Sequence, residues 1–170
     1  MSLRIETPRL LLTELTESMT AEIQRQSLDV ATRRFLPDEV FETYEEALAT
    51  VQELTEAYGS PDGPYVYAVL CQGGALAGYV ELCRIDDGWE IGYHMGEEHR
   101  GRGYAAESIA AFLPVMMDKL ALDRVWGVVA EENAASCRVL EKCGFRLVER
   151  GEGMYHGSIR ARRRYVFERA

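Results

Sequence analysis

The sequence contains no long apolar run, which excludes one broad class of protein. A transmembrane helix needs about 20 predominantly apolar residues in succession, and the 170 residues include no such stretch. The short apolar segment near the N-terminus has acidic residues close by, unlike a secretory signal peptide. We therefore expect a cytoplasmic protein with no membrane partner.

Cysteine is scarce and scattered. The chain has four cysteines, at positions 71, 83, 137 and 143. The spacing of the last two, on one predicted helix, fits neither a zinc site nor a redox motif. We expect reduced thiols in the core and no metal site.

Basic residues are in the minority. Lysine and arginine number 19 against 28 aspartates and glutamates, which gives a formal net charge of −9 at pH 7. Extended nucleic-acid binding needs a basic face that neutralises phosphates, so this composition argues against it. An acidic surface favours a cationic partner such as an amine or a basic peptide, although acidity can also serve solubility alone.

The chain also has no internal repeat, linker or low-complexity segment, so we expect one domain spanning residues 1–170. Apolar periodicity and capping signals predict helices at 18–28, 43–58, about 104–120 and 134–142. Strand signals occur at 10–15, 65–70, 76–84, 89–95, 124–129, 146–155 and 158–168.

Connections between these segments predict the sheet topology. Tight turns join the three strands between 65 and 95, which predicts an antiparallel meander. A long helix separates strand 89–95 from strand 124–129, and such a crossover makes the two strands parallel. The expected fold class is α/β, with a mixed, mostly antiparallel central sheet, one parallel strand pair and flanking helices.

A glycine-rich turn, Arg100-Gly101-Arg102-Gly103-Tyr104-Ala105, connects strand 89–95 to the long helix. Glycine lets a backbone approach a ligand closely, and a helix N-terminus offers free N–H groups and a partial positive charge. Arginines add charge that can grip phosphate. The turn therefore suggests a pyrophosphate site, although an ordinary strand-to-helix turn with solvated arginines stays open.

Two other phosphate folds fit less well. The spacing Gly101-x-Gly103-x-x-Ala106 satisfies a dinucleotide fingerprint, but that fold places the turn early in a parallel sheet. Here antiparallel strands come first, and Asp123 lies before the next strand rather than at its end. A nicotinamide site is therefore disfavoured. A mononucleotide P-loop is excluded because no Gly-Lys-Ser/Thr follows.

Four segments in order resemble the GCN5-related N-acetyltransferase (GNAT) superfamily. Arg100-x-x-Gly103-x-Ala105 matches its acyl-CoA motif, [Q/R]-x-x-G-x-[G/A]. The segment from Glu132 to Phe145, ENAASCRVLEKCGF, is similar to its second signature. The opening TPRLLL and the strand sequence EIGY resemble the RimJ/RimL-like branch. The resemblance spans about 7–167.

The resemblance implies a GNAT fold in which strands 89–95 and 124–129 splay apart to admit the pantetheine arm of acetyl-CoA. Backbone N–H groups of the turn would hold the pyrophosphate. Asn133 would bind the arm as well as cap its helix, or only cap it. The implied acyl-CoA residues are Tyr93, His94, Met95, Arg100, Gly101, Arg102, Gly103, Tyr104, Ala105, Asn133 and Ser136.

The implied reaction is direct attack of a neutral amine on the acetyl thioester. Glu90, ten residues before Arg100, is the first candidate for the base, and a solvated carboxylate at a strand start is the alternative. Glu81 on the preceding strand is the reserve candidate. His94 shares a strand face with Glu90, but we expect it to contribute backbone or to pack.

The acid that protonates the leaving thiolate is harder to assign. Many relatives have a tyrosine directly before Glu-Lys-x-Gly-Phe, whereas this chain has Leu140. The serine of N-x-x-S is the implied substitute, which points to Ser136, although Ser136 can equally be an ordinary first-turn residue. A covalent acyl-Cys137 is disfavoured because no neighbouring histidine would activate the thiol.

The expected function is transfer of the acetyl group from acetyl-CoA to a primary amine, either a protein N-terminus or a small molecule. A non-catalytic acyl-CoA sensor on the same fold is the alternative, suggested by the missing tyrosine. The run Arg160 to Arg164 is interpreted as a charge-protected edge strand, with contact to an acidic substrate or a CoA phosphate left open. A homodimer is possible.

Overall fold

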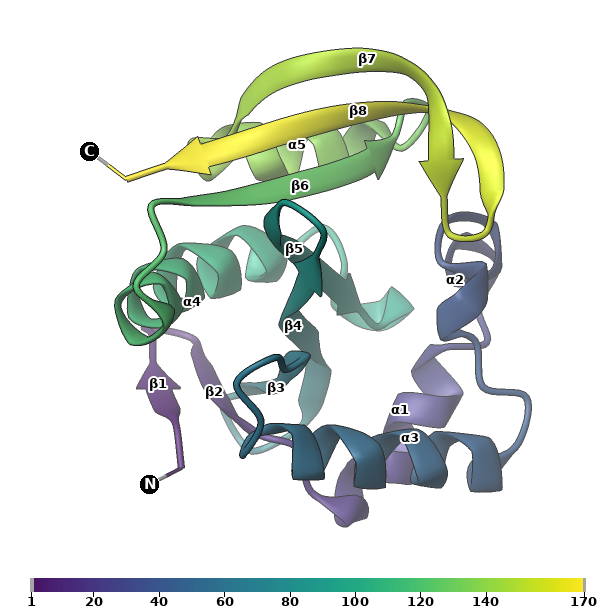
Figure 1. Cartoon of the computed structure of the whole chain (residues 1–170). Helices are drawn as coiled ribbons and strands as arrows, with labels where there is room; N and C mark the ends of the chain where they lie inside the picture. The colour runs from purple at the N-terminus through teal and green to yellow at the C-terminus, as the bar shows by residue number, and fades with distance from the viewer. Residues whose placement is uncertain (1, 170) are drawn as a thin grey trace.

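The computed structural model describes residues 2–169 and contains one sheet with helices on both sides (Figure 1). The strands are β1 (Arg4–Glu6), β2 (Leu10–Glu14), β3 (Tyr65–Cys71), β4 (Leu76–Ile85), β5 (Gly88–Met95), β6 (Arg124–Ala130), β7 (Arg146–Tyr155) and β8 (Ser158–Glu168). The helices are α1 (Thr20–Gln26), α2 (Val30–Phe35), α3 (Tyr44–Ala57), α4 (Tyr104–Leu120) and α5 (Ala134–Lys142), with short 3-10 turns η1 (Glu17–Met19), η2 (Pro37–Glu39) and η3 (Glu97–His99).

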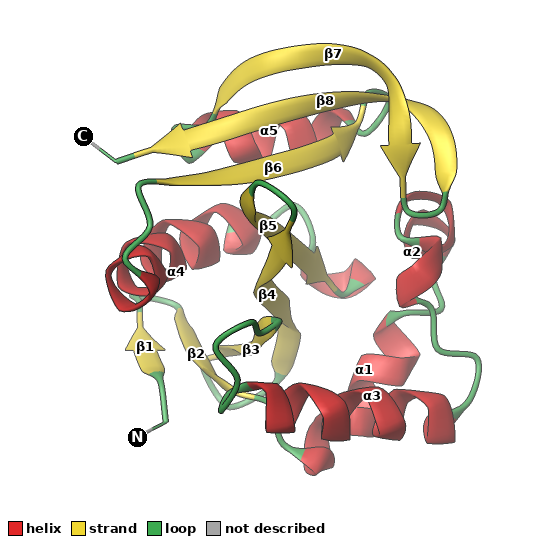
Figure 2. Cartoon of the chain, viewed as in Figure 1, coloured by secondary structure: helices red, strands yellow, loops and turns green. Residues whose placement is uncertain are grey.

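The eight strands follow the order β1-β2-β3-β4-β5-β6-β8-β7. The meander of β3, β4 and β5 is antiparallel, as predicted, and the β7–β8 hairpin turns at the expected residues (Figure 2). Because alternate strand residues point to opposite faces, Tyr67 and Val69 pack toward α4, whereas Val66 and Ala68 pack with Val51 of α3. Helices α4 and α5 therefore cover one face of the sheet, and α1 and α3 cover the other.

The parallel contact between β5 and β6 is limited to a single residue pair, Glu90 with Trp126. Beyond this pair the two strands diverge toward their C-terminal ends, which leaves the middle of the sheet open (Figure 1). Helix α4 crosses between the strands, and its apolar stripe of Ile109, Phe112 and Met116 is fully buried. The predicted fold class, including the splayed parallel pair, is confirmed.

Two helix caps show how local sequence sets where helices begin. The Thr43 hydroxyl accepts a hydrogen bond from the Glu46 backbone N–H at 3.1 Å and so starts α3. The Asn133 side chain does the same for α5 through the Ser136 N–H at 3.3 Å. Gly144, at φ +90°, ends α5 in the left-handed conformation that favours glycine.

Several sequence expectations need correction. Ser18 does not cap a helix; its hydroxyl bonds Thr16, and the α-helical turns begin at Thr20. Strand β1 and helix α2 were not predicted, because three and six residues are too short to show a period.

The strand that carries the arginine run is not an edge strand. Strand β8 pairs with β6 on one side and β7 on the other, so the edge strand at this end of the sheet is β7. The arginines of β8 form ion pairs with acidic residues of neighbouring loops. Arg160 pairs with Glu132, Arg163 with Glu131 and Arg164 with Asp87.

Among residues 2–169, no helix has the length and apolar character needed to cross a membrane.

Candidate active site

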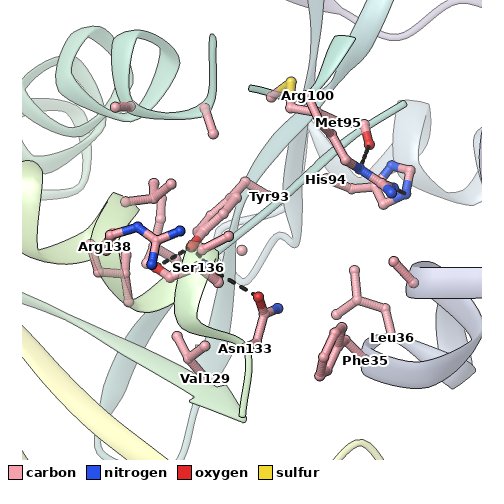
Figure 3. Close-up of a pocket in the computed structure, with 18 of the residues that line it drawn as sticks. Phe35, Leu36, Tyr93, His94, Met95, Arg100, Val129, Asn133, Ser136 and Arg138 are labelled. Atoms are coloured by element: carbon pink, nitrogen blue, oxygen red, sulfur yellow. Dashed lines mark hydrogen bonds between the residues drawn. The ribbon is translucent and has the colours of Figure 1, made fainter. Parts of the chain in front are cut away.

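The divergence of β5 from β6 opens a cavity of about 610 Å³. This volume lies within the range of about 300–1,000 Å³ that is usual for small-molecule sites. The start of α4 and the start of α5 line one end of the cavity, and η2, β4 and the β7–β8 turn line the other. Figure 3 shows side chains from α2, β5 and α5 converging on it.

The glycine turn lies at the first end. Gly101 and Gly103 have φ values of +76° and +81°, a left-handed backbone that glycine adopts without steric cost. Gly103 is the N-cap residue of α4, and no side chain of the described residues caps this helix. Its first-turn N–H groups therefore point outward without side-chain partners, at the positive end of a 17-residue helix.

The two arginines of the turn have different environments. The Arg102 side chain is exposed, and its backbone carbonyl accepts a hydrogen bond from Arg9 Nη1 at 2.8 Å. Arg9 also pairs with Glu107 at 2.7 Å and lies 4.8 Å from the ring centre of Tyr104. Sequence reasoning missed Arg9, which donates a hydrogen bond to the turn from a segment 93 residues earlier in the chain. The Arg100 guanidinium points elsewhere, toward Asp29, rather than into the turn.

A pair of hydroxyl groups joins β5 to the first turn of α5. The Tyr93 hydroxyl donates to the Ser136 carbonyl at 3.0 Å and also hydrogen-bonds the Ser136 side chain (Figure 3). Leu140, where many relatives have tyrosine, is buried and packs on Gly127 and Ile91. The sequence did not reveal that a tyrosine from another element approaches Ser136.

Carboxylates gather at the opposite end of the cavity. Glu90 of β5, Glu81 of β4 and Glu39 of η2 all line it, together with His156 from the β7–β8 turn. Tyr79 donates a hydrogen bond to Glu39. Glu39 was not a sequence candidate, because η2 is far from the strands in the chain and only the fold brings it near.

The Glu81 side chain has room on the strand face because its neighbour on β5 is a glycine. Its carboxylate lies across Gly92, where an added Cβ would come within 2.6 Å of Oε1. His156 is held at this end by the Asp38 carboxylate. The cavity therefore has a backbone-donor end and an acidic end.

Burial changes the proton affinity of these carboxylates. Burial raises the pKa of Glu90, and the nearby charges of His156, Arg162 and Arg164 only partly oppose it. Burial also raises the pKa of Glu81, and the neighbouring Glu39 and Glu90 raise it further. Within residues 2–169 neither Glu81 nor Glu90 forms an ion pair. Such carboxylates are stronger proton acceptors than exposed ones.

His94 is buried and lines the cavity. Its ring stacks on Tyr79, and its Nε2 lies 2.7 Å from the Thr32 hydroxyl. Burial, reinforced by the Arg100 guanidinium, lowers the pKa of His94 to about 4, so the ring is neutral at pH 7.

Comparison with known proteins identifies the family. The family model described as "Acetyltransferase (GNAT) domain" matches residues 9–146. The chain belongs to the GNAT acetyltransferases, and it is an acetyltransferase.

Individual relatives agree with this assignment. The chain is 28% identical over 145 residues to the uncharacterized N-acetyltransferase YoaA of Bacillus subtilis (strain 168), covering 84% of this chain and 82% of that protein. Its fold is similar to a Salmonella typhimurium acetyltransferase that modifies the N-terminal serine of ribosomal protein L7/L12, with TM-score 0.83, 20% identity and coverage of 99% and 100%. A RimL L7/L12 acetyltransferase in complex with coenzyme A has TM-score 0.82, 20% identity and 98% coverage of both chains.

The donor end of the cavity suits the acyl-CoA that the GNAT fold uses. A pyrophosphate needs several N–H donors and positive potential, and the uncapped N-terminus of α4 supplies both. The glycine at the N-cap leaves the approach to these donors open, because it has no side chain there.

Proposed function

We propose that this acetyltransferase transfers the acetyl group of acetyl-CoA to a primary amine by direct attack in a ternary complex. The observation that carries the proposal is that one and the same cavity has helix N–H donors at one end and carboxylates with raised pKa at the other. The amine belongs to a protein N-terminus or a small molecule.

At the donor end, the backbone of Gly101 to Ala105 holds the pyrophosphate, and the exposed Arg102 adds positive charge. The backbone of Tyr93 to Met95 pairs with the amides of the pantetheine arm and polarises the thioester carbonyl. Asn133, the N-cap residue of α5 just after β6, binds the arm from the other side. Because these groups lie on β5 and just beyond the end of β6, the opening between β5 and β6 is the slot for the arm.

At the acceptor end, the carboxylates attract a cationic amine. An α-amine has a pKa near 7.7–8.0, so it loses its proton more readily than a lysine does near 10.4. The structural neighbour that modifies an N-terminal serine supports a peptide α-amine as the first acceptor to test.

Each bond change has a candidate residue. Glu90, directly or through a water, takes the proton of the attacking amine, and Glu81 is the reserve. The new N–C bond forms as the C–S bond breaks, and the departing thiolate has a pKa of about 8.5. We assign the return of a proton to the sulfur to Ser136, which lies on the first turn of α5 and is hydrogen-bonded to Tyr93.

Calorimetric titration of the purified full chain with acetyl-CoA, alongside NADH, tests the donor. We expect acetyl-CoA alone to bind. An amine screen for thiol release then follows, with a seryl peptide amide, an N-blocked lysyl peptide and spermidine as probes. Binding of NADH, or of neither compound, would contradict the assignment of the glycine turn.

A non-catalytic acyl-CoA sensor is the competing function, and the buried Leu140 in place of a tyrosine favours it. Turnover with any amine excludes a sensor, because a sensor binds acetyl-CoA without releasing a thiol. Acetyl-CoA binding without turnover on any probe would favour it. The homodimer and the cytoplasmic location suggested by the sequence stay predictions.

Replacing Ser136 by alanine tests the acid. We expect kcat to fall about 10- to 100-fold, because general acids contribute at least this much when the leaving group needs them. Tyr93→Phe should cause a smaller loss, since it removes only the support of the Ser136 hydroxyl. Steady-state kinetics at pH 7 measures both, with Ser60→Ala in a distant loop as control. Wild-type kcat in Ser136→Ala would remove Ser136 from the mechanism.

Asn133→Ser separates capping from ligand binding. Serine is as good an N-cap as asparagine, so thermal stability should stay the same. The amide donor is lost, and we expect the Kd of acetyl-CoA to rise about threefold to tenfold, the value of one hydrogen bond. Thr43→Ser, at the cap of α3, is the matched control. An unchanged Kd would assign Asn133 to capping alone.

A further inference from the structure

All three nitrogens of the Arg100 guanidinium donate hydrogen bonds within the protein. Its Nε donates to the Met95 carbonyl at 2.9 Å, at the end of β5. Its Nη1 and Nη2 donate to the two carboxylate oxygens of Asp29 at 2.7 and 3.2 Å. This bidentate geometry uses the arginine fork on two partners that belong to different elements.

The partners of Arg100 fix the start of helix α2. Asp29 is the N-cap residue of α2, and its carboxylate accepts a hydrogen bond from the Thr32 hydroxyl. Thr32 is 2% exposed and lies 2.7 Å from His94 Nε2, so the helix is also tied to β5. We call Asp29, Thr32, His94 and Arg100 the α2 latch.

The Arg100–Asp29 pair is one of the two most buried ion pairs of the described residues, together with Arg163–Glu131, whose side chains are 25% and 27% exposed. The side chains of Arg100 and Asp29 are 33% and 12% exposed, whereas most of the other pairs have a partner that is about half exposed or more. Burial alone would raise the pKa of Asp29, but hydrogen bonds from Arg100 and Thr32 lower it to about 2. Paired, partly buried charges of this kind resist rearrangement, because breaking them leaves a desolvated charge unpaired.

The position of α2 matters because the helix forms a wall of the cavity. Ala31, Phe35 and Leu36 line it, and Figure 3 shows Phe35 and Leu36 on the side facing Asn133. The chain then continues directly into η2, which carries Glu39. A shift of α2 would therefore move both the apolar wall and one carboxylate of the acceptor end.

We propose that Arg100 is a positioning residue, which holds α2 as the wall of the acceptor site, and that its side chain is not a phosphate ligand. Its backbone still belongs to the segment that leads into the pyrophosphate turn. Arg100 thus connects the Met95 carbonyl, beside the expected acyl-CoA arm, to the acceptor wall through one side chain. This role rests on the proposed function only in one respect, which is that the two ligands are acetyl-CoA and a primary amine.

The test compares Arg100→Gln, Asp29→Asn and the double variant of the full chain. We expect each single change to raise the KM of the probe amine, a seryl peptide amide, about tenfold, as loss of one charged hydrogen bond does. We expect kcat and the Kd of coenzyme A to stay within about twofold. The double variant should match the singles, because both remove the same contact.

A control on the same helix isolates the latch from helix stability. Arg33→Gln removes an exposed ion pair of α2 with Glu42, and it should leave every parameter unchanged. Arg102→Gln, in contrast, should weaken coenzyme A binding. Thermal melts identify any variant that does not fold, and Arg100→Lys with Asp29→Glu then replace the affected variants.

The result that overturns the proposal is a tenfold or greater loss of coenzyme A affinity in Arg100→Gln without a matching loss in Asp29→Asn. An unchanged amine KM in both single variants also overturns it. If the wild type binds coenzyme A but turns over no probe, amide hydrogen exchange over residues 30–35 decides. Faster exchange in both variants supports the latch, and unchanged exchange contradicts it, whatever becomes of the proposed reaction.

Discussion

Gly103→Asp is expected to abolish acetyl-CoA binding while the protein stays folded. Gly103 is the N-cap of α4 at φ +81°, a conformation that aspartate tolerates better than most residues. A carboxylate there can cap the helix from within, so it occupies the N–H donors and places a negative charge against the pyrophosphate. We expect the Kd of acetyl-CoA to rise at least about 100-fold, since charge and donors are lost together.

The chain offers a matched control for this substitution. Gly73, in the β3–β4 turn, has φ +92° and no heavy atom within 4 Å of an added Cβ. Gly73→Asp therefore carries the same charge and a similar backbone cost, but it lies outside the cavity lining. Calorimetry and thermal melts of both variants measure the difference. Unchanged affinity in folded Gly103→Asp would contradict the pyrophosphate assignment.

The parts of the site that could be predicted are those encoded by neighbouring residues. The turn at Gly101 to Ala105 and the cap at Asn133 depend on local backbone chemistry, which spacing alone reveals. The antiparallel meander and the parallel strand pair followed from connection lengths, because tight turns and one crossover leave few alternatives. Local signals were therefore sufficient for the turn and the cap at the donor end of the cavity, but not for the contact of Arg9 with the turn.

The rest of the site depends on contacts between residues far apart in the chain. Arg100 meets Asp29 across 71 positions, and sequence spacing carries no sign of that pair. Tyr93 reaches Ser136 across 43 positions, so its hydroxyl was missed although its strand was predicted correctly. Helix α2 and η2 are too short for a periodic pattern, and they bring Glu39 into the cavity. The arginine run was misassigned for the same reason, since an edge strand is defined by its neighbours.

Different kinds of substitution are expected to have large effects at the two ends of the cavity. The donor end works through backbone groups, so only substitutions that block them, as at Gly103, have large effects. The acceptor end works through carboxylates, where removing one charge changes the chemistry directly. The base can therefore be tested with a nearly isosteric change.

Glu90→Gln is expected to lower kcat at pH 7 about 100-fold or more, the usual contribution of a general base. The glutamine keeps the shape of the side chain but cannot accept the proton of the amine. Acetyl-CoA affinity should stay within about twofold, because the turn and the arm contacts are untouched. Glu53→Gln, on the exposed face of α3, removes the same charge outside the cavity and serves as control.

The pH dependence distinguishes the base from a merely structural carboxylate. Burial raises the pKa of Glu90, so the base is lost as pH falls through a range above the ordinary value for glutamate. Wild-type kcat/KM should therefore fall on the acid side through two ionisations, that of Glu90 and that of the amine, and Glu90→Gln should keep only the limb of the amine. Above the pKa of an α-amine, near 7.7–8.0, the substrate is already neutral, so the rate of Glu90→Gln should rise but stay below that of the wild type, because the attacking nitrogen must still lose a proton. If Glu81→Gln shows this behaviour and Glu90→Gln retains the wild-type rate, the base is Glu81, whose pKa is raised by the same burial and by its neighbouring carboxylates.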